Sequence, residues 1–113
     1  MTNLQRLLLE IKGIELDQDE LTVYLQENEL NPIDEYNPAS ATNKRNIYKT
    51  ALSILESIAN NPKLMKAYKL DDMTITDFHE NLLNRIDQLE RKIRSMKTDE
   101  QNEQGNTFML FNS

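Results

Sequence analysis

The sequence predicts an all-α protein, a small helix bundle with two short N-terminal helices, a central helix, a long C-terminal helix and an extended C-terminal arm. Three observations lead to this fold class. Apolar residues recur at spacings of three and four in separate stretches, which is the period of a helix with one buried face. Segments rich in Asn, Asp and Pro separate these stretches. After residue 97 the helical pattern stops, so we expect a bundle domain over residues 1–97 and a polar linker with an apolar docking arm over residues 98–113.

Two short helices are expected in the first thirty residues. The first follows Thr2 or Asn3, either of which can cap it, and ends near Gly13. The second begins at Asp17, and Glu20 three residues later gives the spacing of a capping box, in which two side chains accept backbone N–H groups reciprocally. The apolar stripes of the two helices consist of Leu4, Leu7, Leu8 and Ile11, and of Leu21, Tyr24 and Leu25. The sequence therefore predicts a helical hairpin.

A central helix is predicted over about residues 41–60. The preceding residues 31–40 are rich in Asn, Asp, Pro and Ser, which form turns, so we expect a loop there. The apolar face of the central helix consists of Ile47, Tyr48, Ala51, Leu52, Ile54, Leu55, Ile58 and Ala59. So broad a face predicts contacts from two sides. Pro62 then suits the first turn of a brief further helix.

The last helix carries the longest periodic pattern in the chain. We expect it to begin at Thr74 or Thr76 and to run to about Lys97. Its apolar stripe consists of Ile75, Phe78, Leu82, Ile86, Leu89, Ile93 and Met96. The pattern favours packing against the central helix of the same chain, and a coiled coil between chains is the alternative.

The C-terminal segment combines a polar tether with an apolar end. Residues 98–106 are polar and are expected to have no fold of their own. The apolar residues that follow are Phe108, Met109, Leu110 and Phe111. Such a segment is typical of an arm that adds a strand to a partner's sheet or fills a partner's pocket. The alternative is that the arm folds back onto its own bundle.

The charge is unevenly distributed. Thirteen basic and nineteen acidic residues give a net charge of −6. The first 35 residues hold two basic and nine acidic residues, or −7, and the remainder holds eleven and ten, or +1. This acidic block disfavours wrapping of nucleic acid, which requires Lys and Arg. It is either an ordinary solvated face or the lining of a channel past which DNA slides.

The residue inventory predicts a protein that binds other proteins and is not an enzyme. His79 is the only histidine, Gly13 and Gly105 are the only glycines, and cysteine is absent. These counts disfavour a catalytic dyad, a phosphate-binding loop and a cysteine-ligated metal, so we expect no cofactor and no metal. Lys44, Arg45 and Lys49 form a small basic patch that is too limited for a nucleic-acid reader. No apolar run approaches the ~20 residues of a membrane span.

Three stretches, together with the order of the helices, carry a resemblance to a known family. They are Asp19 to Leu25 (DELTVYL), Ala51 to Ala59 (ALSILESIA) and Met73 to Phe78 (MTITDF). In this pattern, which covers roughly the first hundred residues, the chain resembles small head–tail connector (adaptor) proteins of tailed phages of Gram-positive bacteria.

The resemblance implies a structural role in the virion, at the head–tail interface, for a protein made in the host cytoplasm. It implies a homo-oligomeric ring, commonly of twelve subunits, between the portal protein and tail-side connector proteins, with DNA passing through unbound. It assigns portal docking to Phe108, Met109, Leu110 and Phe111, and it allows the acidic Asp17, Asp19 and Glu20 to face the channel. The long polar spacer before the arm departs from many connectors and leaves the arm's target open.

Two other functions are compatible with the residues. The chain could be a cytoplasmic helical regulator or assembly chaperone whose last helix dimerises. It could also be an acidic mimic of DNA that binds a basic enzyme.

Overall fold

A computed structural model describes residues 1–12, 14–61, 63 and 74–99 of the chain. Its helices are α1 (Asn3–Glu10), α2 (Gln18–Glu27), α3 (Ala41–Ala59) and α5 (Ile75–Ser95). Within these described ranges there is no strand, which confirms the predicted small all-α bundle. The brief helix expected after Pro62 lies outside the described residues. No described helix is long and apolar enough to cross a membrane.

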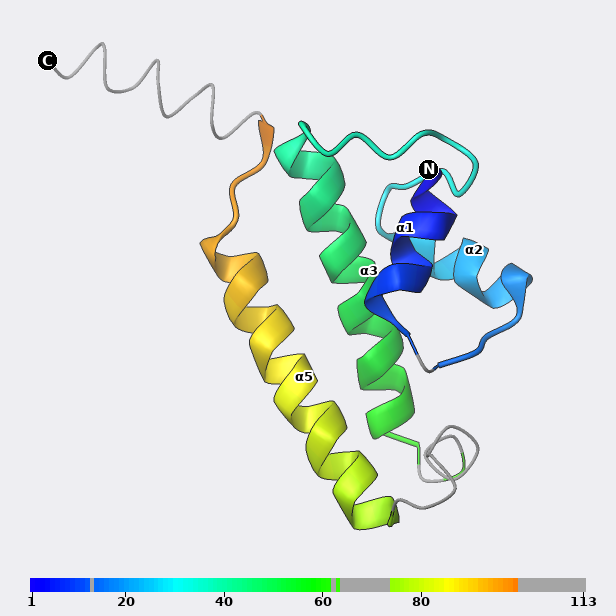
Figure 1. Cartoon of the computed structure of the whole chain (residues 1–113), viewed down its shortest axis with the longest axis vertical. Helices are drawn as coiled ribbons and strands as arrows, with labels where there is room; N and C mark the ends of the chain where they lie inside the picture. The colour runs from blue at the N-terminus through cyan, green and yellow to red at the C-terminus, as the bar shows by residue number, and fades with distance from the viewer. Residues whose placement is uncertain (13, 62, 64–73, 100–113) are drawn as a thin grey trace, which may run out of the picture.

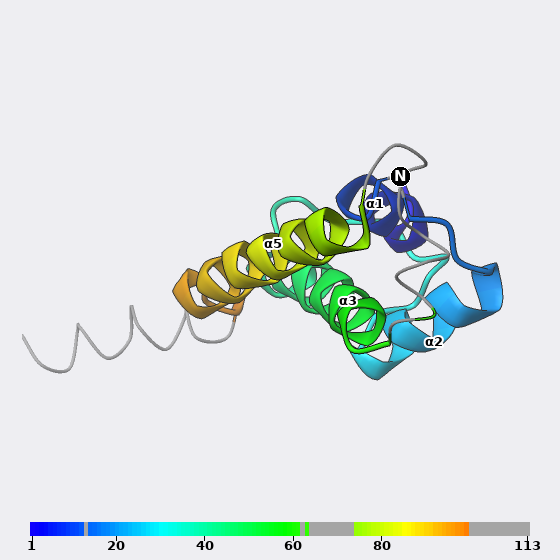
Figure 2. The same cartoon turned by 90° about the horizontal axis from the view of Figure 1, so that it is seen from below.

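The central helix α3 holds the bundle together. The long helix α5 runs antiparallel along one side of α3, and α1 and α2 pack on its other side (Figures 1 and 2). Among the described helices the backbone of α5 lies close to α3 alone, whereas α1 and α2 each lie close to α3 and to each other. The prediction that the central helix is contacted from two sides is therefore confirmed.

The core follows from the apolar stripes of these helices. The largest fully buried apolar side chains are Leu7, Leu25, Ile47, Ile54, Ile58 and Leu89. Each such side chain stabilises the fold by roughly 1.5–3 kcal/mol relative to an exposed position. On α5 the buried residues are Leu82, Leu89 and Ile93, all from the predicted stripe. The stripe thus packs against α3 of the same chain, as the sequence predicts.

Helix starts agree with the sequence except at α2. Thr2 and Gln5 form a capping box at α1, and Thr74 caps α5 by accepting a hydrogen bond from the Asp77 backbone N–H. Asp17 occupies the N-cap position of α2, but its side chain makes no capping hydrogen bond, so the capping box predicted there is wrong. Because Asp17 is exposed, water solvates its carboxylate, and little is lost when it does not turn back onto the helix.

The loop between α2 and α3 is fastened to α1. The first turn of a helix leaves backbone N–H groups without intrahelical partners. Here Asn3 and Leu4 donate theirs to loop carbonyls, Leu4 to that of Pro32 at 3.1 Å. The buried side chain of Asn3 also donates to the Asn31 carbonyl and accepts from Asn43 on α3, both at 2.9 Å. The loop therefore fixes α1 against the start of α3.

Candidate functional site

The end of the described chain is attached to the start of α3 through Asp99. The Ser40 hydroxyl donates to one Asp99 carboxylate oxygen at 2.6 Å, and the Ala41 backbone N–H donates to the other at 2.7 Å. The Asp99 backbone N–H in turn donates to the Thr42 hydroxyl at 2.7 Å. A carboxylate at this place meets the free N–H groups and the positive end of the α3 dipole. Asp99 therefore acts as a second cap on α3, supplied from 58 positions further along the chain.

The electrostatics of Asp99 agree with this arrangement. The hydrogen bond from Ser40, together with those from Ala41 and Thr42, stabilises the charged carboxylate and lowers the pKa of Asp99 below its ordinary value of 3.8. Asp99 is fully exposed, so water screens much of this effect. We therefore expect the interaction to contribute only modestly to the stability of the fold.

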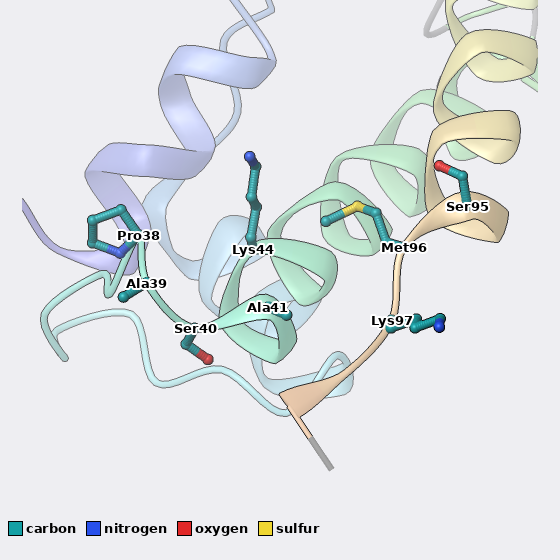
Figure 3. A pocket seen from close by; sticks show the side chains of 8 residues that line it. All are labelled: Pro38, Ala39, Ser40, Ala41, Lys44, Ser95, Met96 and Lys97. Atoms are coloured by element: carbon teal, nitrogen blue, oxygen red, sulfur yellow. The ribbon is translucent and has the colours of Figure 1, made fainter. Parts of the chain in front are cut away.

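A shallow pocket adjoins this junction (Figure 3). It has a volume of about 430 Å³ and lies between the start of α3 and the end of α5. Its lining consists of Pro38, Ala39, Ser40, Ala41, Lys44, Ser95, Met96 and Lys97. Small apolar side chains with two lysines suit contact with a peptide or protein surface, and the lining contains no group with an evident catalytic role.

The predicted docking residues follow directly in the sequence but lie outside the described residues. These residues are Phe108, Met109, Leu110 and Phe111. The last described residue before this segment is Asp99. The polar linker was predicted to begin at residue 98, and its second residue, Asp99, is bonded to α3.

The acidic residues predicted to face a channel lie together on α2. Asp17, Asp19 and Glu20 occupy its N-cap and first turn, and all three are exposed. Asp19, Glu20 and Glu27 stand three or four positions from Val23 and so surround it on one helix face. Val23 is 51% exposed, an apolar centre within an acidic rim. Among the described residues none of these carboxylates is in an ion pair.

On the opposite side of α3, a groove runs between α3 and α5. Leu52 and Ile93 supply its apolar lining, and Glu90 and Arg94 flank it, with a volume of about 230 Å³. Sequence periodicity places Leu52 and Ile93 in buried stripes and gives no sign that their outer edges form a groove. The groove arises from the way in which α3 and α5 cross, and a single sequence does not reveal this crossing geometry.

A partly buried charge cluster joins α1 and α5 and is absent from the sequence predictions. One Glu10 carboxylate oxygen accepts from Arg6 and the other from Arg85, each at 2.7 Å. The Arg6 guanidinium lies 5.4 and 5.7 Å from the ring centres of Tyr36 and Tyr48. Burial lowers the pKa of Arg6, but the hydrogen bond and charge of Glu10 outweigh it, so the pKa is raised. The i,i+4 spacing of Arg6 and Glu10 is the one sign of this cluster that the sequence offers.

Among the described residues there is no group of three His, Asp or Glu side chains that could hold a metal ion. His79 is half-buried on α5 and takes part in an interaction with another group. The surface features described above are the Asp99 junction, the acidic α2 face and the α3–α5 groove.

Comparison with known proteins adds no family. No family model, no curated protein sequence and no solved structure matches the chain.

Proposed function

We propose that this protein is a structural adaptor of a tailed phage, a head–tail connector that forms a ring between the portal and the tail and docks through its C-terminal arm on a neighbouring virion protein. The bundle supplies a rigid body, and the arm supplies a contact that reaches beyond it. The order of the helices, which resembles that of the connector family, supports this assignment. So do the acidic α2 face and the α3–α5 groove, which could contact neighbouring proteins.

The observation that carries the proposal is the bond between Asp99 and the start of α3. It ties the chain to the bundle fourteen residues before its last residue, Ser113. Phe108 is nine residues beyond Asp99, and an extended chain covers at most about 30 Å over that distance. An apolar segment that starts from a fixed point and has a limited reach can find a site on an adjacent subunit in an assembly.

The packing of α5 makes the dimerising regulator the weaker candidate. Its prediction rests on the apolar repeat of the last helix. Leu82, Leu89 and Ile93 of that repeat are buried within the chain, chiefly by α3. A coiled coil would have to use the outer side of α5, where Leu83 is the one exposed large apolar residue among those described.

The test is made in the phage that encodes the protein, by substituting the arm in the genome. We expect Phe108→Ser with Phe111→Ser to give filled heads that fail to join tails, because the docking contact is lost. Asn112→Ser, a polar change in the same segment, is the matched control and should leave the yield of infectious particles unchanged. Normal particles containing the doubly substituted chain would refute docking through the arm.

A further inference from the structure

The charges of the molecule are separated between two sides of α3. Residues 13–43, which include α2, contain no Lys or Arg. By contrast, the groove between α3 and α5 has cations at one end. They are Arg45, Lys49, Arg94 and Lys97. α2 and α5 lie on opposite sides of α3 and do not contact each other (Figure 2).

The four cations lie toward the same end of the groove, two on each side of it. Arg45 and Lys49 precede Leu52 by seven and three positions, so they share its side of α3. Arg94 flanks the groove itself, and Lys97 follows it by three positions. Carboxylates also lie in this region: Glu90 on the groove wall, Glu56 one turn beyond Leu52, and Asp99 at the start of α3. The net charge of this surface is then four minus three, or +1.

These cations have no partners within the described part of the chain. None of the four is in an ion pair with another described residue. Their charges are therefore open to pairing with carboxylates of another molecule.

The acidic face of α2 has the complementary composition. Asp19, Glu20 and Glu27 give it a charge of −3 around the exposed Val23. The groove offers apolar Leu52 and Ile93 beside its cations. An apolar side chain within an acidic rim thus complements an apolar groove with cations at one end, both in polarity and in the sign of the charge.

We propose that the occupant of the α3–α5 groove is the acidic α2 face of a second copy of this chain, with Val23 against Leu52 and Ile93 and the α2 carboxylates against the groove cations. This deepens the proposed function, on which it rests for the biological setting, by naming the contact between neighbouring subunits. It also assigns Asp19 and Glu20 to a subunit contact in place of the channel lining. An apolar centre suits a protein contact and has no use on a surface that DNA only passes.

The placement of the two surfaces gives the contact a direction. Because they lie on opposite sides of the molecule, each copy can offer its α2 to one neighbour and its groove to another. Such a heterologous contact repeats head to tail and generates either a closed ring or an open chain. A two-fold dimer would pair one surface with itself.

Charge-reversal variants of the full chain test this contact by sedimentation velocity at low ionic strength. The groove variant carries Arg94→Glu and Lys97→Glu, and the α2 variant carries Glu20→Lys and Glu27→Lys. All four positions are exposed, so both variants should fold, and circular dichroism checks this. A control with Glu15→Lys and Asp34→Lys changes the net charge by the same amount as the α2 variant, but at positions away from the α2 face.

We expect the unmodified chain and the control to self-associate, and added salt to weaken this association. Each reversal alone should weaken it by about tenfold or more, because like charges then meet. An equimolar mixture of the two reversed variants should associate again, since every contact in an alternating assembly pairs opposite charges.

Three results would overturn the contact. The unmodified chain could remain monomeric at low salt, the α2 variant could associate alone as well as the unmodified chain, or the mixture could fail to recover. The arm variant separates this inference from the proposed function. If Phe108→Ser with Phe111→Ser self-associates normally, a failure of tail joining concerns the arm alone.

Discussion

Glu10 on α1 and Arg85 on α5 are 75 positions apart in the sequence, and their side chains meet at 2.7 Å. Because α1 and α5 otherwise touch α3 and not each other, this ion pair is the described link between the two sides of the bundle. Glu10 also pairs with Arg6, so one carboxylate, on a side chain that is 13% exposed, binds two guanidinium groups.

Removing this carboxylate should destabilise the fold. We expect Glu10→Gln to lower the free energy of unfolding by about 1–3 kcal/mol, because the largely buried Arg6 loses its counter-charge. Urea denaturation measures the change. Asp87→Asn is the matched control, since Asp87 pairs with Arg91 at 3.1 Å on an exposed surface and should cost about 0–1 kcal/mol. Equal effects of the two substitutions would contradict the role given to Glu10.

Two leucines on α5 should differ sharply in their contribution to stability. Leu89 packs toward α3 and is 1% exposed, whereas Leu83 is 47% exposed. We expect Leu89→Ala to cost about 2–4 kcal/mol and Leu83→Ala to change stability by about 0.5 kcal/mol or less. Thermal or urea unfolding compares them directly. A large effect of Leu83→Ala in a monomeric sample would show that α5 is buried on its outer side as well.

The capping residues of the two N-terminal helices give a third comparison. Thr2→Ala removes one half of the capping box and should cost about 0.5–2 kcal/mol. Asp17→Ala should cost only a few tenths of a kcal/mol, because Asp17 makes no capping hydrogen bond and contributes through the α2 dipole alone. The order of the two changes, measured by chemical denaturation, is the result that matters. A larger loss of stability for Asp17→Ala than for Thr2→Ala would indicate that Asp17 does form the capping box that the sequence predicts.

The Asp99 junction predicts a pH dependence. A pKa lowered in the folded state means that the contribution of Asp99 to stability is present above the ordinary pKa of 3.8 and is lost as the pH falls through the lower folded value. We expect Ser40→Ala to raise the pKa of Asp99 toward 3.8, because the largest stabilising hydrogen bond is removed. Carboxyl-detected NMR titration follows the group. Ser53→Ala, whose hydroxyl bonds to the Lys49 carbonyl, is the control and should leave the Asp99 titration unchanged.

Sequence patterns predict the helices well because they depend on local spacing. The stripe from Ile47 to Ala59 and the stripe from Leu82 to Ile93 identify α3 and α5 and their mutual packing. The exception at Asp17 has a local cause as well, since an exposed carboxylate has water as an alternative partner. The spacing of Asp17 and Glu20 does not reveal whether the Asp17 carboxylate caps the helix or is solvated by water.

The candidate surfaces could be predicted only in part. The acidic α2 face follows from the composition of the first 35 residues. The bonds of Glu10 to Arg85 and of Ser40 to Asp99 join positions 75 and 59 apart, and the groove between Leu52 and Ile93 depends on how two helices cross. Such features arise from tertiary packing, so no pattern within one helix indicates them.

The central claim is that this chain is a virion connector, and cryo-electron microscopy of particles from the phage that encodes it tests that claim most directly. The account predicts density for the helical bundle in a stoichiometric ring between portal and tail, with the segment from Phe108 to Phe111 seated on a neighbouring protein. Particles that are complete, joined to tails and free of this chain would contradict it.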